Sequence, residues 1–330
     1  MTKITILGAG IAGLSAAAQL PKHHHITIVA RDLPGDDHES HAWSSPHAGA
    51  IWMPLLDAPP REQDMQLQAF AHMWKIAGEF PESSVKSWVL TPTVFLPWLR
   101  GQLEAAGVAF KRVEVRSLED LKGMGHDVLI NATGWGARYL GDVADRDVEQ
   151  VRGQTVLVKT DFDKVWTRRG RDYIYVISRG DGTAILGGIK QYGNTDTSVD
   201  SALREDVCHQ RRVSEKFLDW LTRRTQIFRR VHDGLPDVFP EQPSDFKVVR
   251  DIVGIRPQRK TGARVERDDV RGQKVVHAYG EFYRSRKSGN VTETQIAGAP
   301  GGGYVYSFGM AREVARLVDE IEQEIPKAKL

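Results

Sequence analysis

The stretch Thr5-Ile-Leu-Gly-Ala-Gly-Ile-Ala-Gly-Leu-Ser15 decides the fold of the N-terminal part of the chain. Residues 3–7 are apolar enough for a short buried strand, and the Ala-rich residues 11–20 have the composition of a helix. The turn between these two segments follows the pattern G-x-G-x-x-G, with glycines at Gly8, Gly10 and Gly13. This pattern is typical of a turn that receives a pyrophosphate at a helix N-terminus. We therefore predict a dinucleotide-binding unit, with an ordinary Gly-rich turn as the alternative.

The composition narrows the class of protein. The chain has 330 residues, enough for about two domains, and a formal net charge of +2 with 27% charged residues. This balance argues against a nucleic-acid-binding surface, so no nucleic acid partner is expected. The single cysteine, Cys208, cannot form an intramolecular disulfide, and no nucleophile signature surrounds it. We expect an inert thiol in a reducing compartment.

Two features bear on location. No apolar run is long enough for a membrane span and no secretory signal precedes the first strand, so neither a membrane nor secretion is expected. The last three residues, Ala328-Lys329-Leu330, differ at one position from the Ser-Lys-Leu peroxisomal address. We expect a peroxisomal matrix location through an import receptor, and a cytoplasmic one if the tripeptide match is accidental.

The first 135 residues alternate between strand and helix patterns, as a parallel sheet requires. We predict strands over residues 26–30, 108–115 and 126–131, and helices over residues 63–75 and 92–106. The spacing of apolar residues in the first of these helices predicts an inward-facing stripe. That stripe consists of Leu67, Phe70, Ala71 and Trp74.

Three consecutive histidines, His23, His24 and His25, come just before the strand over residues 26–30. Because consecutive side chains do not share one face of an extended segment, we predict a surface turn there. No metal site is predicted anywhere in the chain.

From Val151 onward, short alternating segments separated by Gly-containing turns predict an antiparallel sheet and hence a second domain. The strands expected in this sheet are 154–159, 173–178 and 183–189, and further strands are expected over residues 246–253 and 275–280. A polar helix is expected over residues 201–223. A C-terminal helix is expected over residues 306–325, after the run Gly301-Gly302-Gly303.

Further motifs extend along nearly the whole chain. They are Ala30-Arg31-Asp32-Leu33-Pro34, Ser45-Pro46 with Ala48-Gly49-Ala50 and Trp52, Phe95-Leu96-Pro97-Trp98-Leu99, Asn131-Ala-Thr-Gly134, Val151-Arg-Gly-Gln154, Leu186-Gly-Gly188, Gly254-Ile-Arg256-Pro257 with Arg259, His277-Ala-Tyr-Gly280, and the run from Gly303-Tyr304 to Ala311. In this order they resemble the D-amino-acid oxidase family, FAD enzymes that include D-aspartate oxidases. The resemblance implies an α/β fold with a Rossmann-like, doubly wound FAD-binding domain and a mixed or antiparallel-sheet substrate domain. The implied FAD-binding domain comprises residues 1–56, 92–150 and 250–330, and the substrate-binding domain residues 57–91 and 151–249.

The same resemblance implies FAD as the cofactor. The Gly-rich turn would hold its pyrophosphate, and Arg31 with Asp32 would hold its adenosine end. The backbone of Val115 would meet the adenine, and the C-terminal Gly-rich run would close over the flavin. The complete implied set is Gly8, Ala9, Gly10, Ile11, Gly13, Arg31, Asp32, Ser44, Ser45, Gly49, Ala50, Ile51, Val115, Gly301, Gly302, Gly303, Tyr304 and Ser307.

The resemblance also implies how a D-amino acid would be held. Arg256 would bind the α-carboxylate as a bidentate fork, with help from Tyr175 and with Gly303 close by; a surface salt bridge is the alternative for this arginine. Lys190 matches a position that resembles tyrosine or phenylalanine in members that oxidise neutral substrates and arginine in D-aspartate oxidases. A cation there would pair with an acidic side chain, and a lysine that faces solvent is the alternative.

The implied reaction assigns no side chain the role of acid or base. A hydride passes from the substrate Cα to N5 of the flavin, and molecular oxygen is then reduced to hydrogen peroxide. The imino acid hydrolyses to a 2-oxo acid and ammonia.

Two departures from the family pattern leave alternatives open. The chain is several dozen residues shorter than the family between about Glu79 and Trp88, and it carries a polar insertion over residues 281–299. An FAD-binding but inactive protein is therefore one alternative to a D-amino-acid oxidase. A D-aspartate oxidase and a glycine- or sarcosine-oxidising relative are the others, and a homodimer also stays open.

Overall fold

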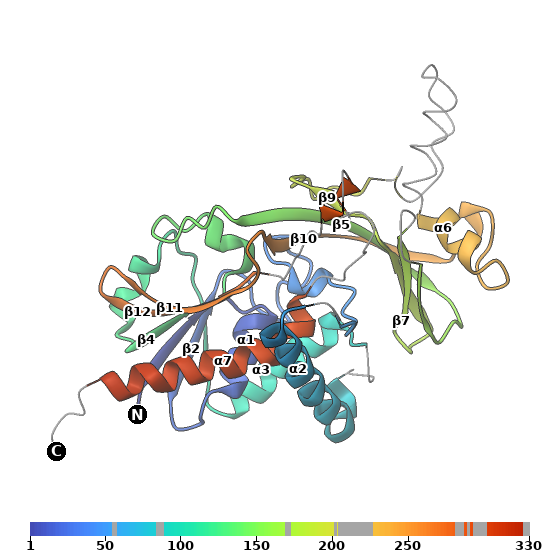
Figure 1. Cartoon of the computed structure of the whole chain (residues 1–330). Helices are drawn as coiled ribbons and strands as arrows, with labels where there is room; N and C mark the ends of the chain where they lie inside the picture. The colour runs from blue at the N-terminus through green and yellow to red at the C-terminus, as the bar shows by residue number, and fades with distance from the viewer. Residues whose placement is uncertain are drawn as a thin grey trace. The chain divides into compact units, whose positions relative to one another are not determined.

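The computed structural model divides the chain into two compact units (Figure 1). Unit 1 comprises Met1–Glu149, Arg256–Tyr283 and Gly301–Leu330, and unit 2 comprises Gln150–Ile255 and Arg284–Pro300. The structure describes residues 1–54, 58–83, 89–168, 173–200, 203, 227–280, 287–288, 291–292 and 302–325. Cys208, Gly301, the C-terminal tripeptide and nearly all of the helix predicted over residues 201–223 lie outside these ranges, as does most of the insertion over residues 281–299.

Unit 1 is built on a six-stranded sheet in the order β11-β12-β4-β1-β2-β3. The strands are β1 (Lys3–Leu7), β2 (His25–Ala30), β3 (Ala109–Arg112), β4 (Val128–Asn131), β11 (Arg264–Val270) and β12 (Gln273–Tyr279). All neighbours pair in parallel except β11 and β12, which are antiparallel. The chain adds β2 and β3 on one side of β1 and then returns to place β4 on the other. In parallel sheets, ligands bind where the strand order reverses, at the carboxyl ends of the strands.

The two faces of this sheet carry separate hydrophobic cores, because strand side chains alternate between faces. Ile4 and Ile6 of β1 belong to the core on the helix-bearing face, whereas Leu7 packs on the opposite face with Leu118 and Leu121. Those two leucines belong to a 3-10 helix, η3 (Leu118–Met124). Full burial of each isoleucine stabilises the fold by about 1.5–3 kcal/mol. The alternation fixes the register of β1 and with it the position of the turn that follows.

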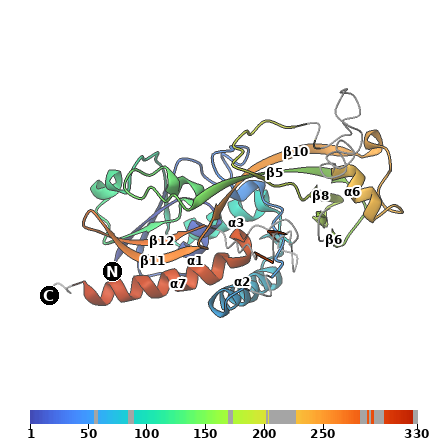
Figure 2. The ribbon, with the colours of Figure 1, turned by 45° about the horizontal axis from the view of Figure 1, so that its top comes forward.

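Three helices cover the first face: α1 (Ile11–Gln19), α3 (Pro92–Ala105) and α7 (Gly303–Glu324). Helix α1 packs against both of the others, and α7 also contacts β11 and β12, as the two ribbon views agree (Figures 1 and 2). Thr91 is the N-cap of α3 and Pro92 its first residue, as predicted. The predicted parallel βα unit at the N-terminus is confirmed, with strand and helix bounds shifted by a residue at most.

The buried face of helix α2 (Pro60–Glu79) differs from the predicted one. The face expected to be buried is in large part exposed: Leu67 is 62% and Trp74 56% accessible. The buried face instead contains Met65, Gln66, Ala69, Met73 and Ile76. Gly309 of α7 explains this choice, because a Cβ there would lie 2.0 Å from the carbonyl oxygen of Met65. The missing side chain lets α2 approach α7 backbone to backbone, and this close contact sets which face of α2 is inside.

The structure also places α2 in unit 1, although residues 57–91 were assigned from the sequence to the substrate-binding domain. Its packing on α7 provides the physical reason.

Unit 2 contains an antiparallel sheet in the order β10-β5-β8-β7-β6, with β9 paired to β5. Its elements are β5 (Val148–Lys159), β6 (Val165–Arg168), β7 (Ile174–Ser178), β8 (Thr183–Gly187), β9 (Gln191–Tyr192), β10 (Val248–Arg259) and α6 (Ile227–Gly234). A separate core unites this sheet with α6, and its centre includes the stacked rings of Phe228 and Phe246, 4.0 Å apart. A further short hairpin pairs β13 (Lys287–Ser288) with β14 (Val291–Thr292). The predicted fold class, an α/β sheet together with an antiparallel sheet, is confirmed.

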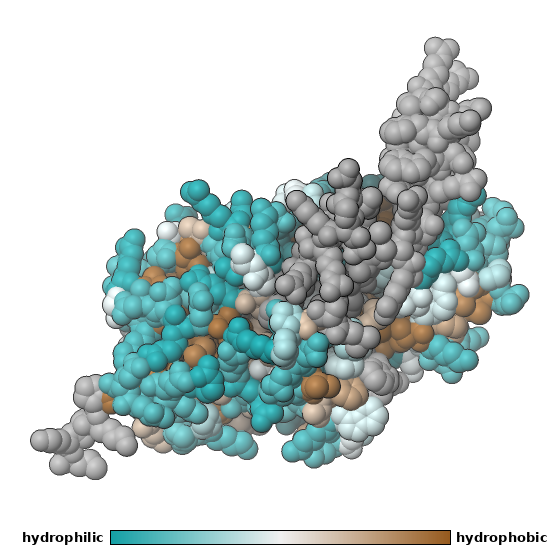
Figure 3. Space-filling model, in the orientation of Figure 1, coloured by the Kyte–Doolittle hydropathy of each residue, from teal (hydrophilic) through white to brown (hydrophobic). Residues whose placement is uncertain are grey.

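The surface is mainly polar. Among the residues drawn in colour in Figure 3, the visible face is largely hydrophilic, and its apolar side chains form small groups. In the described parts of the chain, no helix combines the length and the apolar character that a membrane crossing needs.

Candidate functional site

The turn between β1 and α1 requires glycine at two positions. Gly8 has φ of +114°, and a Cβ there would lie 2.4 Å from the carbonyl oxygen of Ala132, which follows β4. A Cβ on Gly13 would lie 1.9 Å from the carbonyl oxygen of Gly8. Any side chain at these positions would push the helix away from the sheet. The turn is thus pressed against the carboxyl ends of β1 and β4, where the strand order reverses.

Ser45 joins the N-termini of two helices far apart in the sequence. Its hydroxyl oxygen accepts a hydrogen bond from the backbone N–H of Ile11 at 3.0 Å, at the start of α1. Its carbonyl oxygen accepts one from the Tyr304 hydroxyl at 3.0 Å, in the first turn of α7. As a hydroxyl, Ser45 keeps a proton that it can donate. The serine therefore lies beside the starts of both α1 and α7.

Neither helix start carries a compensating negative charge. The first turns of α1 and α7 contain no acidic residue, and their N-caps, Gly10 and Gly302, supply no side-chain hydrogen bond. Helix N-termini carry unsatisfied N–H groups and a partial positive charge. Two such ends beside one serine hydroxyl form a site suited to an anion such as a diphosphate.

A chain of serine contacts locks the two helices together. The Ser15 hydroxyl of α1 donates to the carbonyl oxygen of Ser307 in α7 at 3.1 Å. The Ser307 hydroxyl in turn donates to the carbonyl oxygen of Tyr304 at 2.9 Å. Both serines are fully buried, so these bonds fix the relative positions of the two helix starts. Ser307 was predicted as a cofactor residue. Ser15 was not, although it lies inside the opening motif.

The small-residue loop after β2 contains a strained position. Ser44 and Ser45 precede a short 3-10 helix, and the chain then runs through Gly49 to Ala50, which has φ of +51°. A left-handed alanine is uncommon and is kept only where surrounding contacts impose it. Here Leu90 donates its N–H to the Ala50 carbonyl at 3.0 Å, and Ile51 forms a β-bridge with Val89. These contacts hold the loop in one conformation next to Ser45.

At the carboxyl end of β2, Arg31 and Asp32 pair with each other. The Arg31 Nε donates to Asp32 at 2.9 Å, and its Nη2 donates to the carbonyl oxygen of Ala42 at 3.0 Å. Glu114 lies 3.6 Å from Nη1, and Val115 next to it is half-buried against the core of the opposite face. The two predicted adenosine contacts thus form an ion pair with each other, and their role toward a ligand stays a prediction.

A buried polar network at the carboxyl end of β4 was not predicted from the sequence. The Asn131 side-chain oxygen accepts from the Thr133 hydroxyl at 2.8 Å, and its nitrogen lies 3.2 Å from Nδ1 of His277. His277 Nε2 lies 3.2 Å from the carboxylate of Asp268. Burial lowers the pKa of His277, so the ring is neutral near pH 7. Nδ1 then accepts from Asn131 while Nε2–H donates to Asp268, which holds the turn after β4 against Gly8.

The four predicted substrate contacts, Arg256, Tyr175, Lys190 and Gly303, occupy different elements. Tyr175 is a buried residue of β7, and a Cβ on its cross-strand partner Gly187 would lie 2.6 Å from the phenol oxygen. Lys190 follows β8 and is half-buried. Tyr175 and Lys190 belong to unit 2. Arg256 lies in the last four residues of β10, which belong to unit 1.

Arg256 has one unusual feature. Its Nη1 is buried and donates no hydrogen bond to any residue in the described ranges. A buried donor without a partner costs about 1–3 kcal/mol. A ligand that supplied an acceptor to this guanidinium would remove that cost. Gly303 lies in unit 1, at the start of α7, with the predicted cofactor residues.

Comparisons with known proteins find relatives along nearly the whole chain. A D-amino-acid oxidase from Fusarium vanettenii is 25% identical over 392 aligned positions, covering 96% of this chain and 97% of the relative. A D-aspartate oxidase from Talaromyces thermophilus is 27% identical, covering 96% and 95%. The 392 positions exceed the 330 residues of the chain, so at least 62 of them have no counterpart here.

Solved structures share the fold. Glycine oxidase from Geobacillus kaustophilus superposes with a TM-score of 0.63 at 15% identity, covering 99% of this chain and 96% of that one. L-proline dehydrogenase from P. horikoshii gives 0.64 at 12% identity, covering 97% and 94%. A family model described as FAD dependent oxidoreductase matches residues 83–317. The paired helix starts and Ser45 fit the diphosphate of that cofactor. The chain belongs to the DAO family of FAD-dependent oxidoreductases.

Proposed function

We propose that the protein catalyses the oxidative deamination of D-amino acids. A D-amino acid, molecular oxygen and water are converted into a 2-oxo acid, ammonia and hydrogen peroxide. Bound FAD supplies the two-electron acceptor, which receives a hydride from Cα and passes both electrons to oxygen. The proposal is supported by the relatives named D-amino-acid oxidase and D-aspartate oxidase, which align over nearly the full chain.

The helix starts of α1 and α7 would hold the cofactor by its diphosphate. Backbone N–H groups at Ala9 and Gly10 and the Ser45 hydroxyl would donate to phosphate oxygens, and the helix dipoles would add a favourable field. Gly302, Gly303 and Tyr304 would line the same cofactor from the α7 side. Arg31 and Asp32, as a pair, would meet the adenosine end, and the loop from Gly49 to Ile51 would lie against the ring system.

Arg256 carries the substrate side of the proposal. Its buried Nη1 has no acceptor among the described residues, and a substrate α-carboxylate would supply one. A planar guanidinium matches a carboxylate bidentately, so it would fix the orientation of Cα as well as bind. Tyr175 would add a phenol hydrogen bond to the same carboxylate. Orientation of this kind is the main contribution a protein makes when a cofactor supplies the reactive atoms.

Anaerobic reduction of the holoenzyme tests this function directly. Purified protein with FAD is mixed with D-alanine, L-alanine or glycine in the absence of oxygen, and the flavin absorption band is followed. We expect D-alanine to bleach the band and L-alanine to leave it unchanged. A flavin that stays oxidised with every D-amino acid would support the inactive alternative, and fast bleaching by glycine alone would favour a glycine-oxidising enzyme.

Acidic substrates form the second candidate, because one relative is named a D-aspartate oxidase. Lys190 is the residue proposed to pair with a side-chain carboxylate. The test compares kcat/KM for D-aspartate and D-alanine in wild type and Lys190→Met, with Lys159→Met as a control on the exposed end of β5. We expect Lys190→Met to lower the aspartate-to-alanine ratio about tenfold, the loss of one charge-assisted pair. An unchanged ratio would exclude Lys190 from the proposed contact with the substrate side chain.

We also propose a peroxisomal location, which the proposed chemistry and the tripeptide together support. Hydrogen peroxide is a product of the proposed reaction, and Ala328-Lys329-Leu330 resembles the peroxisomal address. Removing the tripeptide from a fluorescent fusion whose C-terminus is free should move the protein to the cytoplasm.

A further inference from the structure

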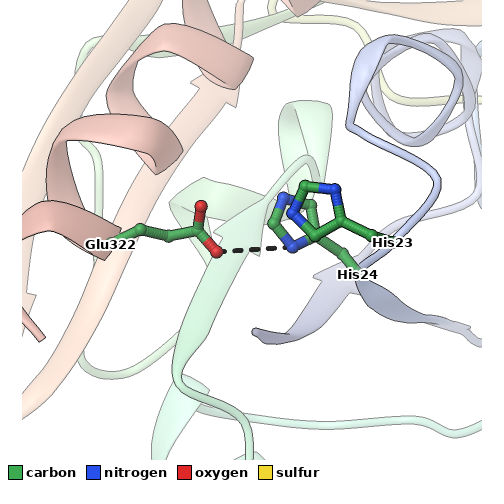
Figure 4. A group of neighbouring side chains, drawn as sticks. All are labelled: His23, His24 and Glu322. Atoms are coloured by element: carbon green, nitrogen blue, oxygen red, sulfur yellow. Dashed lines mark ion pairs between the residues drawn. The ribbon is translucent and has the colours of Figure 1, made fainter. Parts of the chain in front are cut away.

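A cluster of two imidazoles and one carboxylate lies at the end of unit 1 away from the predicted flavin site. The turn before β2 contributes His23 and His24, and the last turns of α7 contribute Glu322 (Figure 4). One ligand-type atom from each residue lies within 4.8 Å of the others. The two rings are adjacent, with centroids 4.1 Å apart, and both lie on the side of the turn that faces Glu322.

His24 is the buried member of this cluster. Its residue is 7% accessible, and neither ring nitrogen forms a hydrogen bond with any residue that the structure describes. Its Nδ1 lies 3.3 Å from Glu322 Oε1, close enough for an ion pair but not aligned as a hydrogen bond. Burying a polar ring without hydrogen bonds is unfavourable, so this arrangement calls for a further partner.

The position of the cluster favours a cation. Glu322 lies in the last turns of α7, where the helix dipole carries partial negative charge, and its carboxylate faces the two imidazoles.

We propose that His23, His24 and Glu322 bind a divalent transition-metal ion of the zinc class. Two imidazole nitrogens and one carboxylate oxygen form a common zinc ligand set, with a fourth position for water. Ligand atoms bound tetrahedrally at 2.0–2.1 Å lie about 3.3 Å from one another, and the His24–Glu322 separation is 3.3 Å. His23 is exposed, so its side chain can move toward the ion without disturbing the core.

The ion at this site would stabilise the fold and is separate from the proposed oxidation. His24 precedes β2 at the amino end of the sheet, whereas the flavin site lies at the carboxyl ends. The six residues of β2 put about 20 Å between them. The ion would connect the turn before β2 to α7, where neither ring nitrogen of His24 forms a hydrogen bond within the described residues. Binding to the folded state alone raises its stability by mass action.

The alternative is a plain ion pair between His24 and Glu322, and the exposed His23 distinguishes the two. In an ion pair, His23 contributes nothing, while in a metal site it supplies one of three ligands. His23→Asn removes that ligand from the surface and leaves the core intact. Glu322→Gln removes the carboxylate charge. His25→Asn and Glu320→Gln are the matched controls, an adjacent exposed histidine and a neighbouring glutamate that pairs with Arg316.

The experiment uses untagged, full-length holoenzyme treated with a chelator and then dialysed. ZnCl2 is titrated calorimetrically, and thermal unfolding is recorded with and without the metal. We expect one Zn²⁺ per chain in the wild type and both controls, with a higher unfolding temperature in each. His23→Asn and Glu322→Gln should bind at least about tenfold more weakly, as the loss of a zinc ligand requires. The rate of flavin reduction by D-alanine should not change.

Two results would overturn the proposal: no stoichiometric Zn²⁺ in the wild type, or binding that is unaffected by both ligand variants. Because these readouts do not depend on turnover, an inactive enzyme would not obscure them. Electron paramagnetic resonance of bound Cu²⁺ provides a second check. Nitrogen splitting from two imidazoles in the wild type should fall to that of one in His23→Asn, and splitting that stays the same would also contradict the assignment.

Discussion

The two ends of α7 have opposite chemical surroundings. Its N-terminus lies beside Ser45 and the start of α1, with no acidic residue in its first turn. Its C-terminal turns carry Glu322, which faces two histidines. A helix of 22 residues spans about 33 Å, with partial positive charge at its start and partial negative charge at its end. One helix therefore favours an anion at one end and a cation at the other.

The two ends of α7 also use different chemical groups. The N-terminal end uses backbone N–H groups, glycines and small hydroxyl side chains, all drawn from short motifs. The C-terminal end uses side chains from residues 23–24 and 322, which only the folded chain brings together. This difference decides which end can be recognised in the sequence. The two largest expected effects concern the anion-binding end.

The largest effect is expected from Gly13→Val, which breaks the anion-binding end. A Cβ at this position would lie 1.9 Å from the carbonyl oxygen of Gly8, so α1 must move away from the turn. We expect a loss of about 3 kcal/mol in the free energy of unfolding and purification without FAD. Flavin absorbance and urea unfolding measure both. Gly101→Ala, in an exposed part of α3 with no atom near the added Cβ, should be neutral or stabilising.

A smaller effect is expected from Ser45→Ala, which leaves the backbone intact and removes one hydroxyl. The variant loses the acceptor for the Ile11 N–H and the proposed donor to phosphate. We expect the Kd for FAD, measured by fluorescence with apoprotein, to rise about tenfold, equivalent to about 1.4 kcal/mol. Ser117→Ala removes a similar cap from η3 and should leave the Kd unchanged. An unaffected Kd in Ser45→Ala would remove this serine from the cofactor site.

A pH-dependent effect is expected from His72, which stacks on Phe308 of α7 with centroids 3.9 Å apart. Burial lowers the pKa of His72 to about 4, and the charges of Lys75 and Arg312 add to the shift. The unfolded chain takes up the proton near pH 6.5, before the folded chain does. The stability that the neutral ring provides is therefore complete above pH 6.5 and lost between pH 6.5 and about 4.

Urea unfolding midpoints at pH 7, 6 and 5 measure this loss. We expect the midpoint of His72→Gln to fall less steeply with pH than that of the wild type. His24, His126 and His277 also have lowered pKa values, so some slope remains in the variant. Parallel curves for the two proteins would show that His72 titrates alike in both states.

The sequence predicted what depends on short-range patterns. The Gly8-to-Gly13 turn, its strand and its helix follow from local spacing, and Thr91-Pro92 marks the start of α3 correctly. The prediction of the buried face of α2 was wrong because that helix has two apolar stripes. Only the missing side chain at Gly309 of α7 selects between them. The expectation for His23 and His24 failed to anticipate Glu322, since nothing in the local sequence indicates that the end of α7 returns to this turn.

The predictions for the candidate site were limited in the same way. Gly10, Ser45 and Tyr304 were each predicted, but the hydrogen bonds through which Ser45 joins both helices could not be derived from spacing. Ser15 and the Asn131–His277–Asp268 network were missed because their partners lie on other elements. Arg256 was chosen by resemblance, and its role stays a prediction; its buried Nη1 has no hydrogen-bond acceptor among the described residues.

The most direct test of the proposed function is the concentration dependence of anaerobic flavin reduction by D-alanine in Arg256→Lys. Stopped-flow traces give the substrate Kd and the limiting rate separately. Because lysine cannot form the bidentate contact, we predict a Kd at least about tenfold higher than in the wild type. The control Arg250→Lys, six residues earlier on the same strand, should leave both values unchanged. An unaltered Kd and rate in Arg256→Lys would contradict the assignment of this arginine as the carboxylate-binding residue.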